Sequence, residues 1–418
     1  MSRYRDLILN KNFTLYNIGQ MLSQFAERLI QFILIGIVYK IAPGSTTQLA
    51  KMLIFTAIPA FLVSPIAGVY VDRFNKKHVL IFSDLIRAIM VLFIGIFLTD
   101  GTSLVPIYII VFIIFSSACF FIPARLSIIP ELTSKDNILT ANSFAMISWI
   151  GAGAIGFTTG AFIVEFMGIR LALFINAFLY LLSALVIIFL PEHIKKHHNK
   201  LSIKKVTKEL ENIIKNSFIH ELKEGMVYFF KNKSSRFVLS IFFIFMSLLG
   251  ALYVVGIVFI QEQTGLVTAG LGLMGFFFFL GFLIGSYFYG KLGTRYSRKK
   301  IIFLSFILSG LSISLFAFAL KGWHANWPSY IILLLLGIAI SPVVISSNTI
   351  IHETIDHKMR GRVFSSIGVI MNGGFAIFMY ATSYIAELVS NFSIIFSCGI
   401  LLSIIGVSGY FFTRKITI

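Results

Sequence analysis

The chain has 418 residues, of which 57% are hydrophobic and only 12% are charged, and its mean hydropathy is +0.91. Soluble domains contain roughly one-half apolar and one-quarter charged residues, so a soluble fold could not bury this much apolar surface. The formal charge of +18 would suit a nucleic-acid-binding protein. Its distribution excludes that class, because Lys and Arg concentrate in alternate loops between apolar segments.

Apolar segments of about 20 residues, the length that crosses about 30 Å of hydrocarbon as a helix, recur along the chain. The first six lie near 13–39, 48–70, 79–98, 104–128, 138–164 and 169–190. The second six lie near 236–260, 267–289, 300–320, 329–351, 363–386 and 392–412. These runs are continuous, which favours helices over the alternating strands of a membrane barrel. We therefore predict an all-α membrane protein with 12 transmembrane helices.

The basic loops set the expected orientation. Clusters of Lys and Arg at the N-terminus, at 73–77, 195–236, 291–300, 358–362 and the C-terminus follow the positive-inside rule. Both termini are thus expected in the cytoplasm, and the basic rim is expected to meet anionic membrane lipids. No nucleic-acid partner is expected.

Two six-helix bundles, 1–190 and 236–418, are predicted on either side of a cytoplasmic linker, 191–235. Within the linker, Val206, Leu210, Ile213 and Phe218 recur at helical spacing among Lys and Glu. That spacing predicts an amphipathic helix at the membrane surface, with a solvated linker helix as the alternative.

The two halves are expected to be repeats. Arg73-Phe-Asn-Lys-Lys and Arg295-Tyr-Ser-Arg-Lys are 222 residues apart (295 − 73 = 222), and three further pairs share this offset: Gly68 and Gly290, Glu131 and Glu353, and Glu165 and Glu387. A constant offset predicts parallel repeats, with substrate bound near the bilayer midplane between two halves that rock against each other.

The first span contains a polar stripe at spacings of three and four residues, which places all of its members on one helix face. The members are Asn17, Gln20, Gln24, Glu27 and Gln31. Such a stripe must face protein or a water-filled cavity, because lipid offers polar groups no partners. We expect these residues to bind substrate or protons, with Glu27 as the acid that takes up a proton.

Arg28 leaves an alternative open, since it could fold back onto Glu27 and form a static ion pair. In the third span, Asp84 and Arg87 are three residues apart and are expected to form a structural ion pair. Asn176, Asn348 and Asn372 are intramembrane amides that either line the substrate cavity or join helices.

The segment Gly68-Val-Tyr-Val-Asp72-Arg73-Phe-Asn75-Lys76-Lys77 resembles the major facilitator loop signature G-x-x-x-D-R-x-G-R-R. Asn75 replaces the usual glycine, a mild departure because Asn tolerates a left-handed turn. A degenerate copy, from Gly290 to Lys299, lacks the acid. The resemblance implies the major facilitator fold and a secondary transporter.

Within that superfamily, four segments resemble the drug-exporter branch that includes macrolide efflux proteins. They are Pro123-Ala-Arg125, Glu131 to Ser143, His220 to Met226, and Gly361-Arg362-Val-Phe364-Ser. The resemblance implies proton-driven export of a small hydrophobic, cationic or amphipathic substrate by a multi-pass protein of a bacterial cytoplasmic (inner) membrane, expected as a monomer. Lysophospholipid or siderophore transport is the alternative. The segment from Ala152 to Ala161 resembles the antiporter signature G-x-x-x-G-P-x-x-G-G, with Phe157 in place of the proline, and so implies antiport.

A conformational latch is expected around the loop signature, at the cytoplasmic side. Its members are Gly68, Asp72, Arg73, Lys76, Lys77, Arg125, Glu131 and Arg362. Asp72 is expected to meet the helix N-terminus at 361–362, and Arg73 to pair with Glu131 or Asp136. The alternative is that these charges only orient the loop.

Other function classes find no support. The G-x-G-x-x-G matches at Gly151 and Gly270 follow no strand, His352 and His357 are five residues apart and do not share a face for zinc, and no P-loop sequence occurs. We expect neither enzyme nor channel, no metal and no cofactor, and a proton gradient as the energy source.

Overall fold

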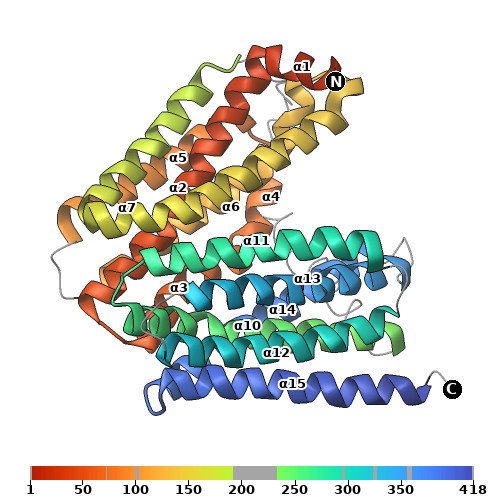
Figure 1. Ribbon diagram of the computed structural model, residues 1–418. Coiled ribbons are helices and arrows are strands. Elements are labelled where there is room, and N and C mark those ends of the chain that lie inside the picture. Colours follow the sequence, from red (N-terminus) through yellow and green to blue (C-terminus); the bar gives the residue numbers. More distant parts are fainter. Residues whose placement is uncertain are drawn as a thin grey trace. The chain divides into compact units, whose positions relative to one another are not determined.

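The computed structural model describes residues 2–71, 73–98, 103–191, 233–293, 297–322, 327–354 and 360–416. Every regular element in these ranges is a helix (Figure 1). The predicted amphipathic linker helix falls within residues 192–232, outside the described residues.

The N-terminal half contains these helices: α1 (Ser2–Leu9), α2 (Lys11–Ile41), α3 (Thr46–Leu62), α4 (Ser64–Val71), α5 (Lys76–Phe93) with a π-helical extension η1 (Ile94–Leu98), α6 (Val105–Leu132), a 3₁₀ turn η2 (Lys135–Asn137) and α7 (Ile138–Ile188). The C-terminal half contains α10 (Lys233–Thr264), α11 (Ala269–Leu292), α12 (Arg298–Gly322), α13 (Trp327–Thr354), α14 (Arg360–Ala386) and α15 (Asn391–Ile416).

Within the described residues, nine helices are long and apolar enough to cross a membrane. One of them, α7, holds two spans, because Gly168 breaks it at φ 79° and ψ 161°. Helices α3 and α4 together supply another span, and α14 the last. The 12 predicted spans are thereby accounted for, and the chain is a multi-pass membrane protein.

The second span differs from the prediction, because it is interrupted between α3 and α4 at Val63. Pro59 lies inside α3, and Pro65 follows the break in the first turn of α4. Proline has no N–H to donate and its ring crowds the preceding turn, which bends a helix at this point.

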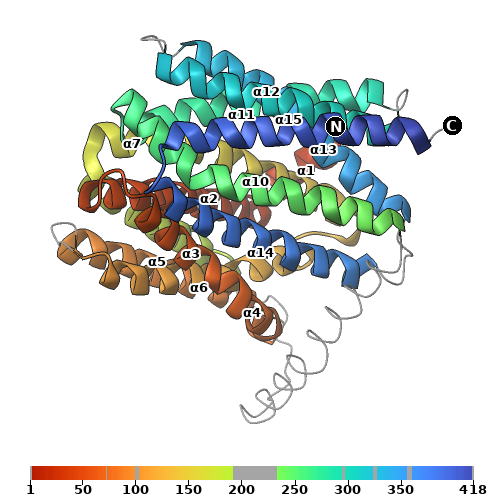
Figure 2. The ribbon, with the colours of Figure 1, turned by 90° about the horizontal axis from the view of Figure 1, so that it is seen from below.

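Contacts divide the described residues into two compact units. The first comprises residues 2–43, 51–191 and 267–272, and the second comprises 44–50, 233–266 and 273–416. In the first unit, α2 packs along α7, and α5 packs between α6 and α7. In the second, α10 packs on α14, and α12 packs on α13 and α15 (Figures 1 and 2).

Candidate functional site

The polar stripe of α2 lies against α7. The amide nitrogen of Asn17 donates to Ser148 Oγ at 3.0 Å, and that of Gln20 donates to the Ala145 carbonyl at 3.1 Å. The same Gln20 nitrogen reaches Asn17 Oδ1 at 2.6 Å. Both side chains are buried, so this end of the stripe joins α2 to α7.

Arg125, from α6, extends the same buried network. Its Nη1 donates to Gln20 Oε1 at 3.0 Å, and its guanidinium stacks 4.7 Å from the ring centroid of Trp149. We expected Arg125 to join the loop charges near Glu131. The side chain instead turns toward α2 and α7, because a buried guanidinium needs polar and aromatic partners.

The predicted pair of Asp84 and Arg87 is present and is the most buried charge pair among the described residues. Arg87 Nη2 lies 2.5 Å from Asp84 Oδ1, and both side chains are 0% exposed. Asp84 also accepts hydrogen bonds from Ser23 Oγ at 3.0 Å and Ser183 Oγ at 2.6 Å. Donors from α2, α5 and α7 therefore surround this carboxylate.

The guanidinium of Arg87 is held on all sides except one. Its centre lies 4.7 Å from the Phe121 ring centroid and 4.6 Å from that of Tyr180. Nε donates to the Ser83 carbonyl, and Nη2 to Ser23 Oγ. Nη1 is left without a hydrogen bond among the described residues, and it faces Glu27.

Glu27 Oε2 lies 3.8 Å from Arg87 Nη1, and the Glu27 side chain is 19% exposed. This distance allows an ion pair but no hydrogen bond. In the described part of the chain, no hydrogen-bond donor reaches Glu27. It is thus the loosely held partner of a cation whose other partner, Asp84, is held tightly.

The alternative in which Arg28 pairs with Glu27 is not what the structure shows. Arg28 Nη1 donates to Gln31 Oε1 at 3.2 Å, and the cation next to Glu27 is Arg87. Residues 27 and 28 point about 100° apart on a helix, whereas Arg87 approaches from α5. Gln24, also on α2, is buried with its amide nitrogen unsatisfied among the described residues.

Of the three predicted intramembrane amides, Asn176 joins helices. It is 0% exposed and donates to the Ala26 carbonyl at 2.6 Å. Asn372 is exposed on α14, so its role as a cavity-lining residue stays a prediction. The Asn348 side chain lies outside the described part of the structure.

In the loop signature, Lys76 Nζ pairs with Glu131 Oε1 at 2.7 Å, and buried Lys77 donates to the Leu190 carbonyl at 2.6 Å. Asn75 has φ −64°, and its side chain accepts from the Lys77 N–H, so it is an N-cap of α5. Our explanation by a left-handed turn was wrong.

The remaining expectations for the latch are open. Asp72 and the side chain of Arg362 lie outside the described residues. Gly68 lies within α4, where an added Cβ would have no neighbour within 4 Å. The pairing of Arg73 with Glu131 or Asp136 stays a prediction.

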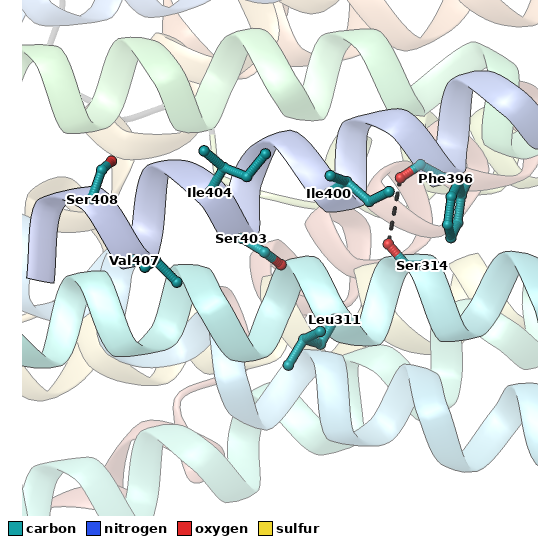
Figure 3. Close-up of a pocket in the computed structure, with 8 residues that line it drawn as sticks. All are labelled: Leu311, Ser314, Phe396, Ile400, Ser403, Ile404, Val407 and Ser408. Atoms are coloured by element: carbon teal, nitrogen blue, oxygen red, sulfur yellow. Dashed lines mark hydrogen bonds between the residues drawn. The ribbon is translucent and has the colours of Figure 1, made fainter.

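A groove of about 550 Å³ lies on the second unit between α12 and α15 (Figure 3). Its lining includes Leu311, Ile400, Ile404 and Val407, together with Ser314, which donates to the Phe396 carbonyl. None of its lining residues is charged, so it has no group that could recognise an ion. Among the described residues no cluster of His, Cys, Asp or Glu could hold a metal.

Residues that sequence reasoning missed complete the site. Ser23, Ser183, Phe121 and Tyr180 all contact Asp84 or Arg87. Ser23 offered a signal, since it lies four residues before Glu27 and so on the same face of α2. The other three lie in apolar spans without a distinguishing pattern.

A bundle of apolar spans with charged residues buried inside it is typical of a membrane transporter, because ionisable groups are costly within a bilayer and are kept for function. The comparison with known protein families also indicates a membrane transporter. The family model of the Major Facilitator Superfamily matches residues 16–267 and 237–417. The chain belongs to this superfamily, whose members are transporters and not enzymes.

The relatives include several transporters of Bacillus subtilis. YkuC, an uncharacterized MFS-type transporter, is 25% identical, with 86% of this chain and 81% of YkuC covered. BacE, a proposed bacilysin exporter, is 27% identical, with 84% of this chain and 83% of BacE covered. Multidrug resistance protein 2 is 26% identical over a region that covers 48% of this chain and 50% of that protein.

Solved structures support the fold. The nucleoside transporter NupG has a TM-score of 0.69 at 14% identity, with 97% of this chain and 98% of NupG covered. A POT family transporter in complex with 5-aminolevulinic acid has a TM-score of 0.71 at 13% identity, with 97% and 96% covered. At these identities the likeness establishes the fold alone.

Proposed function

We propose that the chain is a proton-coupled exporter of hydrophobic or cationic drugs that works by alternating access in a bacterial cytoplasmic membrane, with Glu27 as the residue that exchanges a proton. The observation that supports Glu27 is its position 3.8 Å from a fully buried guanidinium. A carboxylate that couples transport must gain and lose a proton without breaking the bundle.

Glu27 meets this requirement, and Asp84 does not. When Glu27 is neutral, Arg87 keeps its close pair with Asp84 and its hydrogen bonds to Ser23 and Ser83. When Glu27 is charged, the free Nη1 of Arg87 offers it a counter-ion. Protonating Asp84 would instead leave a buried arginine without its charge partner, which is strongly destabilising.

The other two arginines near Glu27 do not pair with it, because each binds a different partner. Arg125 is engaged by Gln20 and Trp149, and Arg28 by Gln31. The partial exposure of Glu27 gives a proton, or a cationic group of a substrate, a route to its carboxylate. Drug export as the direction and substrate class is supported by the names of two relatives, BacE and Multidrug resistance protein 2.

A retention assay in cells tests this function. Cells expressing the wild-type chain or Glu27→Gln receive a macrolide, a lipophilic cationic dye or a fluorescent lysophospholipid, with and without a protonophore. We expect the wild type to expel the macrolide or the dye, and both the substitution and the protonophore to abolish expulsion. Redistribution of the lysophospholipid alone would contradict drug export and favour the lipid alternative.

A further inference from the structure

The groove between α12 and α15, both within the second unit, has the length of a lipid chain. Figure 3 shows Ser403 and Val407 between the two helices. On α15 the lining extends from Phe396 to Ser408, which is about 18 Å at 1.5 Å per residue. One leaflet has a hydrocarbon depth of about 15 Å, half of the bilayer core. The groove therefore matches a hydrocarbon chain of one leaflet.

The lining suits hydrocarbon better than a polar group. Four large aliphatic side chains of the lining are exposed: Leu311, Ile400, Ile404 and Val407. The three serines of the lining donate to backbone carbonyls at 3.1–3.4 Å: Ser314 to Phe396, Ser403 to Ile307 and Ser408 to Ile405. These hydroxyl hydrogens are used within the unit, so they are not available to a ligand.

Three phenylalanine rings pack together at one end of the groove. The ring centroid of Phe318 lies 5.1 Å from that of Phe396 and 5.3 Å from that of Phe392. Phe396 and Phe392 are stacked, with centroids 5.8 Å apart. Phe396 is also the lining residue nearest the start of α15. A chain in the groove therefore ends at these rings, and its head group lies toward the opposite end.

That opposite end lies where α12 begins and α15 ends, because the two helices are antiparallel. A Cβ on Gly310 would collide with the Gly399 carbonyl, and a Cβ on Gly409 would collide with the Phe303 ring. Residue numbers along α12 thus rise as those along α15 fall. The positive-inside pattern predicts that this end faces the cytoplasm.

Both helices carry basic residues at this end. Arg298, Lys299 and Lys300 form the first turn of α12, and Arg414 and Lys415 lie in the last turn of α15. Neither helix contains an Asp or a Glu that would neutralise them. Position 414 is six residues beyond the end of the groove at 408, or about 9 Å along the helix. An apolar groove thus leads to a concentration of positive charge.

We propose that this groove binds one acyl chain of an anionic phospholipid from the cytoplasmic leaflet, and that Lys299 and Lys300 bind its phosphate. The inference goes beyond the proposed function and does not depend on it. A lipid tail gains little by leaving the bilayer for the groove, because the surrounding tails are equally apolar. The head group therefore determines which lipid binds, and basic residues at the membrane surface favour an anionic one.

A second copy of the chain would suit this surface less well. Copies in one membrane have the same orientation, and a two-fold contact uses the same surface of both. Contact through α12 and α15 would place two sets of the same cations together, and like charges repel. An anionic phospholipid instead neutralises the cations while its chain fills the groove.

Native mass spectrometry of the delipidated full chain tests the head-group contact. Phosphatidylglycerol and phosphatidylethanolamine with identical acyl chains are added separately, and the dissociation constant of the first bound lipid is measured. We expect the wild type to prefer phosphatidylglycerol, and Lys299→Gln with Lys300→Gln to weaken its binding about tenfold. The absence of either effect would overturn the proposal.

Lys321→Gln is the matched control for charge. Lys321 lies at the other end of α12, 4.5 Å from the Phe392 ring centroid, much as Lys299 lies 5.3 Å from that of Phe237. This substitution removes a cation of the same kind away from the predicted phosphate site. It should leave phosphatidylglycerol binding unchanged, and an equal loss in this control would overturn the proposal.

Val407→Trp tests the groove itself, because a larger side chain at this lining position would occupy the space of the acyl chain. It should weaken phosphatidylglycerol binding, whereas Leu401→Trp, at an exposed position of α15 outside the lining, should not. If Val407→Trp does not purify, Val407→Phe replaces it, with a smaller loss expected. Equal binding by the groove variant and its control would contradict the site.

The same spectra report a second copy as the occupant. A dimer that Val407→Trp abolishes, with phosphatidylglycerol binding unaffected by that substitution, would overturn the lipid site in favour of a chain–chain contact. The measurement uses neither drug nor proton gradient. Failed drug export would therefore contradict the proposed function and leave the result for the lipid site unchanged.

Discussion

Asp84 and Glu27 both face the guanidinium of Arg87, but they differ in hydrogen bonding, which suits them to different roles. Asp84 has three donors and no exposure, whereas Glu27 has an ion pair at 3.8 Å and partial exposure. Asp84 balances the buried charge of Arg87, and we propose Glu27 as the carboxylate that exchanges a proton.

Stability measurements should separate these tasks. Asp84→Asn leaves Arg87 buried without its close counter-ion and should cost about 3–5 kcal/mol. Glu27→Gln should cost less than about 1 kcal/mol, because the partner is distant and the side chain partly exposed. Thermal unfolding followed by fluorescence size-exclusion chromatography gives the comparison, and equal destabilisation by both substitutions would refute the assignment.

Asn75 offers a second test at the residue scale. Its side chain accepts from the Lys77 N–H at 3.0 Å, so Asn75→Ala should lose about 1 kcal/mol of stability. Asn75→Gly, which introduces the glycine of the superfamily signature, should cost only a few tenths of that. The same unfolding assay distinguishes them, and a larger loss with glycine than with alanine would argue against the N-cap.

At the scale of elements, the contact of α2 with α7 positions the site. Small residues on α7 let the two backbones approach, and the buried amides of α2 bond across the contact. A Cβ at Gly156 would lie 3.1 Å from Phe25 Cα and 3.2 Å from its carbonyl oxygen. Neither backbone atom can move without shifting the helix that bears Glu27.

Gly156→Ala should therefore destabilise the first unit by about 1–3 kcal/mol and lower transport. Gly151, one and a half turns earlier on α7, is the control, since a Cβ there would have no neighbour within 4 Å. Gly151→Ala should be neutral or stabilising by up to about 1 kcal/mol, because alanine is the better helix former. Thermal unfolding of Gly156→Ala and Gly151→Ala tests this expectation. Equal stability of the two variants would contradict the close approach of α2 and α7 at Gly156.

Sequence patterns predicted which residues share a helix face, but not which helix lies opposite. The stripe of α2, the pairing of Asp84 with Arg87 and the positions of the spans follow from spacing and hydropathy. That Glu27 faces Arg87 and not Arg28, and that Arg125 binds Gln20, depends on how helices pack. Packing joins these residues, which are 60 and 105 positions apart, and no local pattern encodes that.

At the scale of the whole molecule, the 222-residue offset was the most informative feature of the sequence. It predicted the two six-helix repeats, which the family match supports across the chain. It did not predict which helices pack together within each unit, because packing is visible only in three dimensions. The substrate is likewise undetermined by the fold, which serves many substrates.

Coupling of substrate movement to proton movement through Glu27 is tested most directly in proteoliposomes. Purified wild type and Glu27→Gln are reconstituted with a pH-sensitive dye inside, and a gradient of a lipophilic cationic substrate is imposed without a pH gradient. We predict that the substrate gradient drives proton movement in the opposite direction in the wild type, and that Glu27→Gln reduces this flux at least about tenfold while the protein remains folded. Undiminished proton movement in Glu27→Gln would contradict the role assigned to this residue.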